Sequence, residues 1–189
     1  MSIEFVGMVF PNQWSETRGT RITNKLDLDY LRYHARAHEY AGFNKVLIAN
    51  SAASPDSTQI AAYLAQHTET LGFMIAHRPG IQTPNLAARS FATLDHLTGG
   101  GRIRLHAITG ITAEPQEGDF ITDKIQCYKR TNEYLEIINK LWQSDEPFNY
   151  QGEFFHIENA HIPLKPVHGR IPISFGGASD IEYEIAVQQ

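Results

Sequence analysis

The feature that most constrains the fold of this 189-residue chain is a regular alternation of short apolar runs with longer segments of helical periodicity. Short apolar runs closed by glycine, proline or polar residues are typical of buried strands, whereas apolar residues spaced three and four apart are typical of helices. The pattern predicts strands at 3–11, 45–49, 71–76, 102–109 and 171–175, and helices at 28–41, 57–65, 84–98, 121–143 and 180–189. Five strand–helix repeats imply an α/β fold with a parallel sheet.

Residues suited to helix ends support these boundaries. Asp27 and Asp56 are expected to cap the first two helices, and Thr83 followed by Pro84 is typical of the start of a third. Gly42 is expected to end the first helix. Residues 148–166 alternate only loosely and predict a small hairpin outside the repeat pattern.

Two architectures fit such a pattern, a doubly wound open sheet and a TIM (β/α)8-type barrel. A dinucleotide-binding open sheet carries G-x-G-x-x-G after its first strand, but residues 11–14 read PNQW. The barrel is therefore preferred. A complete barrel needs eight units and roughly 250 residues, so we expect residues 1–189 to form a single partial domain, truncated to about five βα units.

Composition narrows the class of protein. Hydrophobic residues make up 42% of the chain, and the net charge of -5 comes from interleaved acids and bases without a basic stripe, so nucleic acid is not an expected partner. No apolar run approaches the ~20 residues of a membrane span. The first residues lack a secretion signal and Cys127 is the single cysteine, so we expect a cytoplasmic protein.

Candidate functional residues follow the carboxyl ends of the predicted strands, where barrels place their active sites. They comprise Asn12, Gln13, Trp14, Asn50, Ser51, Ser54, Asp56, His77, Arg78, His106 and Thr109. Asp56 is equally well explained as a helix cap. Arg78 could pair with an anionic substrate or with a neighbouring carboxylate on the rim. Ser54, His77 and His106 are weak catalytic candidates, since a lone histidine is more often structural.

The turn at 176–179 reads GGAS and leads from the fifth strand into a predicted helix. Glycine allows close approach of a ligand to the backbone, and a helix N-terminus offers free N–H groups, which together suit a phosphate. A tight turn with Ser179 as a plain helix cap explains the same residues, and the pattern alone leaves both readings open.

Metal binding is not expected. His34 and His38 are spaced to share one helix face, but no glutamate follows His34 and the pair lies well inside the first helix, away from the barrel mouth. Cys127 falls within a predicted helix and is interpreted as a small core residue.

Three stretches together resemble the luciferase-like flavin-dependent monooxygenases, and most closely their alkanesulfonate monooxygenase branch. Residues 84–100 read PNLAARSFATLDHLTGG, which is similar to a helix signature of that superfamily. Thr109-Gly110 is followed by GDF at 118–120 and by YKRTNEYLEI at 128–137. Residues 172–180 read PISFGGASD. The resemblance extends, in order, over essentially the whole chain.

The resemblance implies a TIM barrel that binds reduced FMN (FMNH2) at its mouth and oxygenates a small organic substrate, an alkanesulfonate being one candidate, through a peroxyflavin. Carried over by position, it implies that Asp56 and Thr109 lie near the flavin ring and that Tyr128, Ala178 and Ser179 hold the phosphate. Arg78 matches a rim position with a candidate role in substrate binding. The implied partners are O2 and a flavin reductase, and we expect a homo-oligomer.

The sequence departs from the family pattern in ways that bear on activity. Ser54 stands where the sulfonate enzymes carry a cysteine, and Gln13 and Lys124 replace histidines. The strands that complete the family's sulfonate pocket have no counterpart in residues 1–189. Two alternatives therefore stay open beside the monooxygenase: a truncated flavin-binding protein without turnover, and an inactive gene remnant.

Overall fold

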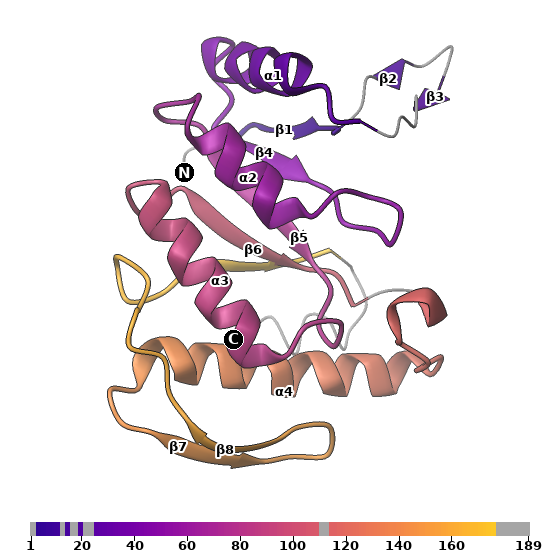
Figure 1. Ribbon diagram of the computed structural model, residues 1–189, viewed down its shortest axis with the longest axis vertical. Coiled ribbons are helices and arrows are strands. Elements are labelled where there is room, and N and C mark those ends of the chain that lie inside the picture. Colours follow the sequence, from indigo (N-terminus) through magenta and orange to yellow (C-terminus); the bar gives the residue numbers. More distant parts are fainter. Residues whose placement is uncertain (1–2, 12–13, 16–18, 21–24, 110–113, 177–189) are drawn as a thin grey trace.

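The structure is a computed structural model that describes residues 3–11, 14–15, 19–20, 25–109 and 114–176 (Figure 1). A five-stranded parallel sheet is formed by β1 (Val6–Val9), β4 (Lys45–Ile48), β5 (Gly72–His77), β6 (Ile103–Ala107) and β9 (Ile173–Phe175). The helices that join these strands are α1 (Leu28–Tyr40), α2 (Ser57–Ala65), α3 (Pro84–Leu97) and α4 (Lys124–Gln143). Smaller elements are β2 (Trp14–Ser15), β3 (Gly19–Thr20), the 3-10 helix η1 (Pro115–Glu117), β7 (Phe148–Gln151) and β8 (His156–Ala160).

The strand order separates the two architectures that the sequence left in competition. The sheet runs β1-β4-β5-β6-β9, so each new strand is added beside the previous one and on the same side. Because crossovers between parallel strands are right-handed, an unbroken order places every connecting helix on one face of the sheet. Figure 1 shows α1, α2, α3 and α4 following one another along the sheet. This is the arrangement of a TIM barrel, and the predicted fold class is confirmed.

The predicted helix caps form as expected. Asp27 accepts a hydrogen bond from the backbone N–H of Tyr30 at 2.9 Å, and Asp56 accepts one from Gln59 at 2.9 Å. Thr83 caps α3 ahead of Pro84. The helix predicted at 121–143 begins instead at Lys124, because Asp123 caps it through the N–H of Gln126.

Other differences from the sequence predictions lie at strand ends and in loops. The outer strands are shorter than predicted, with β1 confined to Val6–Val9 and β9 to Ile173–Phe175. The short β2–β3 pair and η1 were not predicted, because two- and three-residue elements leave no periodic pattern. The hairpin predicted in 148–166 is present as β7–β8, which lies beyond α4 from the sheet (Figure 1). The last predicted helix falls outside the described residues.

The core lies between the sheet and its helices. Val9, Ile48, Ile75 and Leu105 occupy aligned positions on adjacent strands, share one face and are buried. They pack under apolar helix residues that include Leu31, Leu64, Phe91 and Ile138. Successive strand residues point to opposite faces, so the neighbouring positions form the concave face, where a barrel interior lies.

Asp95, within the 84–100 stretch, holds two loops at the amino-terminal end of the strands. One carboxylate oxygen accepts from the N–H of Gly101 at 3.0 Å, and the other accepts from the N–H of Val167 at 2.9 Å. This aspartate is nearly fully buried. Its role is therefore to order the turn before β6 and the segment that leads to β9. None of the described helices is long and apolar enough to cross a membrane.

Candidate functional site

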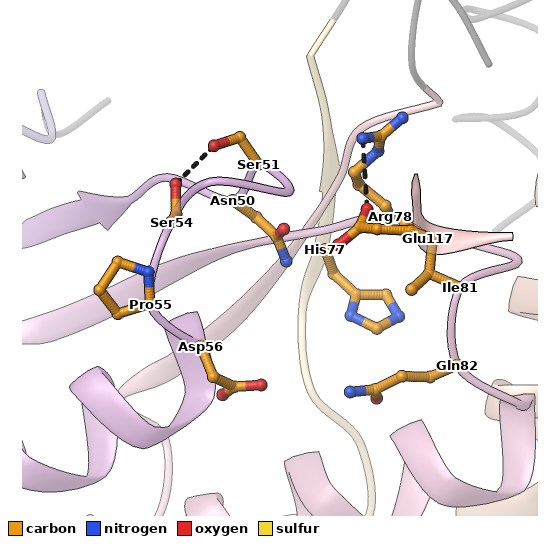
Figure 2. Close-up of a pocket in the computed structure, with 10 residues that line it drawn as sticks. All are labelled: Asn50, Ser51, Ser54, Pro55, Asp56, His77, Arg78, Ile81, Gln82 and Glu117. Carbon is orange, nitrogen blue, oxygen red and sulfur yellow. Dashed lines mark hydrogen bonds and ion pairs between the residues drawn. The ribbon is translucent and has the colours of Figure 1, made fainter. Parts of the chain in front are cut away.

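A polar cavity of about 180 Å³ opens at the carboxyl-terminal edge of the sheet, next to the ends of β4 and β5. Its walls come from the β4–α2, β5–α3 and β6–α4 loops. The lining residues are Asn50, Ser51, Ser54, Pro55, Asp56, His77, Arg78, Ile81, Gln82 and Glu117 (Figure 2). Parallel strands bring the loops that follow them to one edge, so residues distant in sequence meet here.

The β4–α2 loop contributes two hydroxyls and a carboxylate. The hydroxyls of Ser51 and Ser54 lie 2.6 Å apart and hydrogen-bond to each other. One oxygen of Asp56 accepts from the N–H of Gln59 and from the hydroxyl of Thr58. Figure 2 shows the Asp56 carboxylate directed into the space between the His77 ring and the Gln82 amide. Asp56 therefore serves as a helix cap and a cavity wall at once.

His77, the last residue of β5, is 5% exposed and packs edge-on against Phe91, with a ring-centroid distance of 5.4 Å. Its Nε2 lies 2.7 Å from the hydroxyl of Tyr134 on α4. Burial lowers the pKa of His77 from 6.5 to about 4, against a smaller opposing effect of the Asp56 carboxylate. Burial also raises the pKa of Tyr134. Both groups are therefore neutral at pH 7.

Arg78 follows directly and is held by carboxylates of the β6–α4 loop. Its Nη1 lies 2.6 Å from an oxygen of Glu114 and 3.7 Å from one of Glu117. The Arg78 side chain is only 9% exposed. Of the two partners that the sequence suggested for this arginine, the structure places the rim carboxylate beside it.

A second ion pair fixes the same loop to α4. Arg130 donates to both oxygens of Asp119, at 2.9 and 2.8 Å, and both residues are buried. The paired geometry lowers the pKa of Asp119, mainly through the hydrogen bond from Arg130. Gly80 has a φ of +100°, and a Cβ there would lie 2.5 Å from Cζ of Arg130. Glycine at this position therefore lets the arginine pass under the β5–α3 loop.

The cavity unites six of the candidate site residues, namely Asn50, Ser51, Ser54, Asp56, His77 and Arg78. Candidates on β6, on α4 and in the loop after β6 lie elsewhere, and Trp14 belongs to the short strand β2. Thr109 is half-buried after β6, Tyr128 is buried on α4 with Nζ of Lys124 5.4 Å from its ring, and His106 lies on the concave face with Nδ1 3.0 Å from the Ser174 hydroxyl. Ala178, Ser179 and Gln13 lie outside the described residues.

Sequence reasoning missed part of this site. Gln82 and Glu117 line the cavity, and Tyr134 supports His77, yet none was singled out as functional. The available signal for the Arg78 pairs was the presence of acidic residues in the long loop before α4 together with an arginine directly after β5. Tyr134 gave no signal, because its spacing on α4 matches that of any core residue.

His34 and His38 do not form a recognisable metal centre. Their ring centroids lie 4.7 Å apart, and Nδ1 of His38 hydrogen-bonds to the backbone carbonyl of His34 at 2.9 Å. Within the part of the chain that the structure describes, no group of three or more His, Cys, Asp or Glu residues is placed to hold a metal ion.

Solved structures share this architecture. A riboflavin lyase with modified FMN and riboflavin is 19% identical, with a TM-score of 0.83 over 98% of this chain and 52% of its own. EDTA monooxygenase from Chelativorans sp. BNC1 is 22% identical, with a TM-score of 0.80 over 97% of this chain and 51% of its own. A coenzyme F420-dependent tetrahydromethanopterin reductase from Methanopyrus kandleri is 16% identical, with a TM-score of 0.75 over 98% of this chain and 53% of its own.

The chain spans about half the length of each of these proteins, and at such identities the likeness shows the fold alone. The family assignment comes from the sequence itself, since the family model described as luciferase-like monooxygenase matches residues 3–189. That match covers almost the entire sequence and agrees with the strand order and the position of the cavity. The chain therefore belongs to the luciferase-like monooxygenase family.

Proposed function

We propose that this chain forms part of the reduced-flavin site of an FMNH2-dependent monooxygenase that oxygenates a small organic molecule. The observation that carries the proposal is the convergence of three βα loops on one polar cavity, at the edge where barrel enzymes place their chemistry. Family membership supplies the reaction class.

The donors and acceptors of the cavity fit the polar edge of a flavin ring, which carries carbonyl oxygens beside an N–H group. Asn50 and Gln82 offer amides, and Ser54 offers a hydroxyl. A buried oxygen of Glu117 has no hydrogen-bond partner among the described residues. Reduced flavin bound here would supply the electrons that activate O2, one atom of which enters the substrate. The chain's own residues would bind the flavin, orient it and exclude water from it.

The residue roles implied by the family pattern are part of the same proposal. Asp56 and Thr109 would lie beside the flavin ring, and Asp56 already faces the cavity. Tyr128 would hold the phosphate with Ala178 and Ser179, and the ammonium group of Lys124 near the Tyr128 ring supports an anion there. Ser54 and His77 are the candidates best placed to contact a reacting group, whereas His106 lies on the concave face.

The proposed partners are a flavin reductase that delivers FMNH2, O2 and a small organic substrate, for which an alkanesulfonate is the first class to test. A homo-oligomer in the cytoplasm completes the proposal. Two neighbours that differ in cofactor, one with modified FMN and one dependent on F420, make the choice of cofactor a necessary part of the test.

The decisive experiment is an anaerobic titration of the purified chain with FMN, FMNH2 and F420, followed by addition of O2 and octanesulfonate and measurement of sulfite. Binding of FMNH2 with release of sulfite supports the monooxygenase. Binding without sulfite supports a flavin-binding protein or another substrate. Binding of neither FMN nor FMNH2 contradicts the proposal.

A matched pair of variants connects that titration to the cavity. Asp56→Asn removes the cavity carboxylate but keeps a good helix cap, and Asp27→Asn makes the same change at the cap of α1. We expect Asp56→Asn to change FMNH2 affinity by roughly tenfold, the value of one charged hydrogen bond. Asp27→Asn should leave it unchanged. Equal effects of the two variants would place the flavin elsewhere.

A further inference from the structure

The Tyr134 hydroxyl determines which nitrogen of His77 carries the proton. The hydroxyl is buried, and Nε2 of His77 at 2.7 Å is its one hydrogen-bond partner among the described residues. A phenol at pH 7 carries a proton that must be donated, because an unpaired buried donor is costly. Tyr134 therefore donates to Nε2, which accepts. The neutral ring then carries its own proton on Nδ1.

The side of the His77 ring that carries Nδ1 faces the cavity. His77 is nine-tenths buried, and no described residue forms a hydrogen bond with its Nδ1. The ring lines the cavity together with Asn50, Asp56 and Gln82, and Figure 2 shows these side chains directed toward a common space. An N–H donor with no acceptor among the described residues is thus presented to whatever occupies the cavity.

The charges of the lining restrict which acceptor can approach that donor. Among the lining residues that the structure describes, Asp56 and Glu117 are carboxylates, Arg78 is the one cation, and His77 is neutral. The Arg78 charge is further offset by Glu114, which lies 2.6 Å away. The lining is therefore net negative, so it repels an anionic group at this position, and the sulfonate group of an alkanesulfonate substrate would have to bind outside this cavity. The carboxylates of the lining accept hydrogen bonds from N–H groups.

We infer that His77 is a specificity-determining residue, whose Nδ1–H, oriented by Tyr134, binds the carbonyl oxygen of a neutral amide-like group with an adjacent N–H. Such a group occurs on the pyrimidine edge of a flavin and in amide substrates, and both sources share this chemistry. Tyr134 is a positioning residue that acts only through the His77 ring. The inference rests on the proposed function and deepens it, because it states which kind of ligand group, a neutral carbonyl with an adjacent N–H, binds next to the β4–α2 loop.

Nuclear magnetic resonance of the full chain with ¹⁵N-labelled histidine tests the first step without any flavin. Long-range ¹H–¹⁵N correlations distinguish the two neutral tautomers and the imidazolium, and His77→Gln identifies the His77 signals. We expect the Nδ1–H tautomer at pH 7 and at pH 5.5. An Nε2–H tautomer, or a charged ring at pH 7, would overturn the inference.

The role of Tyr134 is tested with Tyr134→Phe, which removes the hydroxyl and keeps the ring. The expected result is a mixture of the two neutral His77 tautomers, with the fold verified by circular dichroism. An unchanged tautomer in a folded variant would show that Tyr134 does not position the ring. If the variant does not fold, the tautomer and ligand measurements on the unmodified chain still decide the inference.

Ligand class is tested by titrating the labelled chain with acetamide, methylammonium, methanesulfonate and FMN. We expect acetamide to shift the His77 Nδ1 resonance, methanesulfonate and methylammonium to leave it in place, and His77→Phe to weaken acetamide binding roughly tenfold. A response to methanesulfonate equal to that of acetamide would contradict the inference, and so would the absence of any response to both acetamide and FMN.

Competition identifies the source of the amide-like group. If saturating FMN shifts Nδ1 and prevents the acetamide response, the flavin ring supplies the group; if acetamide still binds, a substrate supplies it. Failure of this inference is distinguishable from failure of the proposed function. FMN binding with a His77 that responds to neither FMN nor acetamide removes the inference alone, whereas an acetamide response without flavin binding removes the proposed function alone.

Discussion

The two faces of the parallel sheet are built from the same strands but meet different surroundings. On the helix-facing side, Ile48, Ile75 and Leu105 are buried. On the concave side, the adjacent positions Leu47 and Met74 are half-buried, and they are followed across the sheet by a charged residue, Arg104. Figure 1 shows the helices along the sheet that account for the first environment.

This difference indicates that the position of a side chain relative to the helices, more than its residue type, determines how much it contributes to the stability of the fold. Leucines and histidines occur on both faces, and ion pairs occur at both ends of the sheet, so each kind of interaction can be compared with its counterpart. The helix-facing members should stabilise the fold strongly. The concave members should contribute little, because solvent already reaches them.

The largest contrast is expected between two leucines. Leu105→Ala removes a fully buried side chain and leaves a cavity, so the free energy of unfolding should fall by about 2–5 kcal/mol. Leu47→Ala, on the concave face, should cost about 1 kcal/mol, because part of its surface is already in contact with water. Urea denaturation followed by circular dichroism measures both. Equal losses would show that the concave face is as tightly covered as the helix-facing one.

The next contrast concerns two histidines on neighbouring strands and opposite faces. His77 has a pKa of about 4 in the folded chain and about 6.5 when unfolded, so below pH 6.5 the unfolded chain binds the additional proton. Its contribution to stability is complete above pH 6.5 and is lost as the pH falls toward 4. The expected loss is about 2 kcal/mol between pH 7 and pH 5.

Two variants isolate that contribution. His77→Gln should flatten the dependence of unfolding free energy on pH by this amount. His106 is half-buried on the concave face, and burial together with Arg104 also lowers its pKa, so His106→Gln should flatten the curve in the same direction but less. Denaturation curves at pH 5, 6 and 7 provide the measurement. A larger change for His106→Gln would reverse the assignment of the two faces.

Much of the fold could be predicted from local sequence, for identifiable reasons. Asp27, Asp56 and Thr83 are caps whose chemistry depends only on the next three residues, and all three cap as expected. The motif-based family resemblance is confirmed by the family model. The barrel class followed from the missing glycine motif after β1, and strand order provided the structural confirmation.

The site was only partly predictable, because its contacts join residues far apart in the chain. Strand ends located Ser54, Asp56, His77 and Arg78, since the rule for barrels needs only strand positions. The Tyr134 partner of His77 is 57 residues away, and periodicity along α4 gives no information on which ring meets it. The phosphate-site residues Ala178 and Ser179 lie beyond the described residues, so their role stays a prediction.

The smallest contrast is expected between two ion pairs. Asp119 and Arg130 attach the β6–α4 loop to α4, and this pair is buried and doubly hydrogen-bonded. Asp119→Asn should therefore lower the free energy of unfolding by about 1.5 kcal/mol. This is the lower end of the range for charged hydrogen bonds, because asparagine keeps one acceptor oxygen. Glu4 contacts Lys45 and Arg104 at the other end of the sheet and is well exposed, so Glu4→Gln should cost less than about 0.5 kcal/mol. In 1 M salt the Glu4 effect should vanish, since the screening length shrinks to about 3 Å, whereas the Asp119 effect should persist. A salt-sensitive Asp119 would mean that water reaches the pair, and the loop that carries Glu114 and Glu117 would then be held more loosely than its contacts indicate.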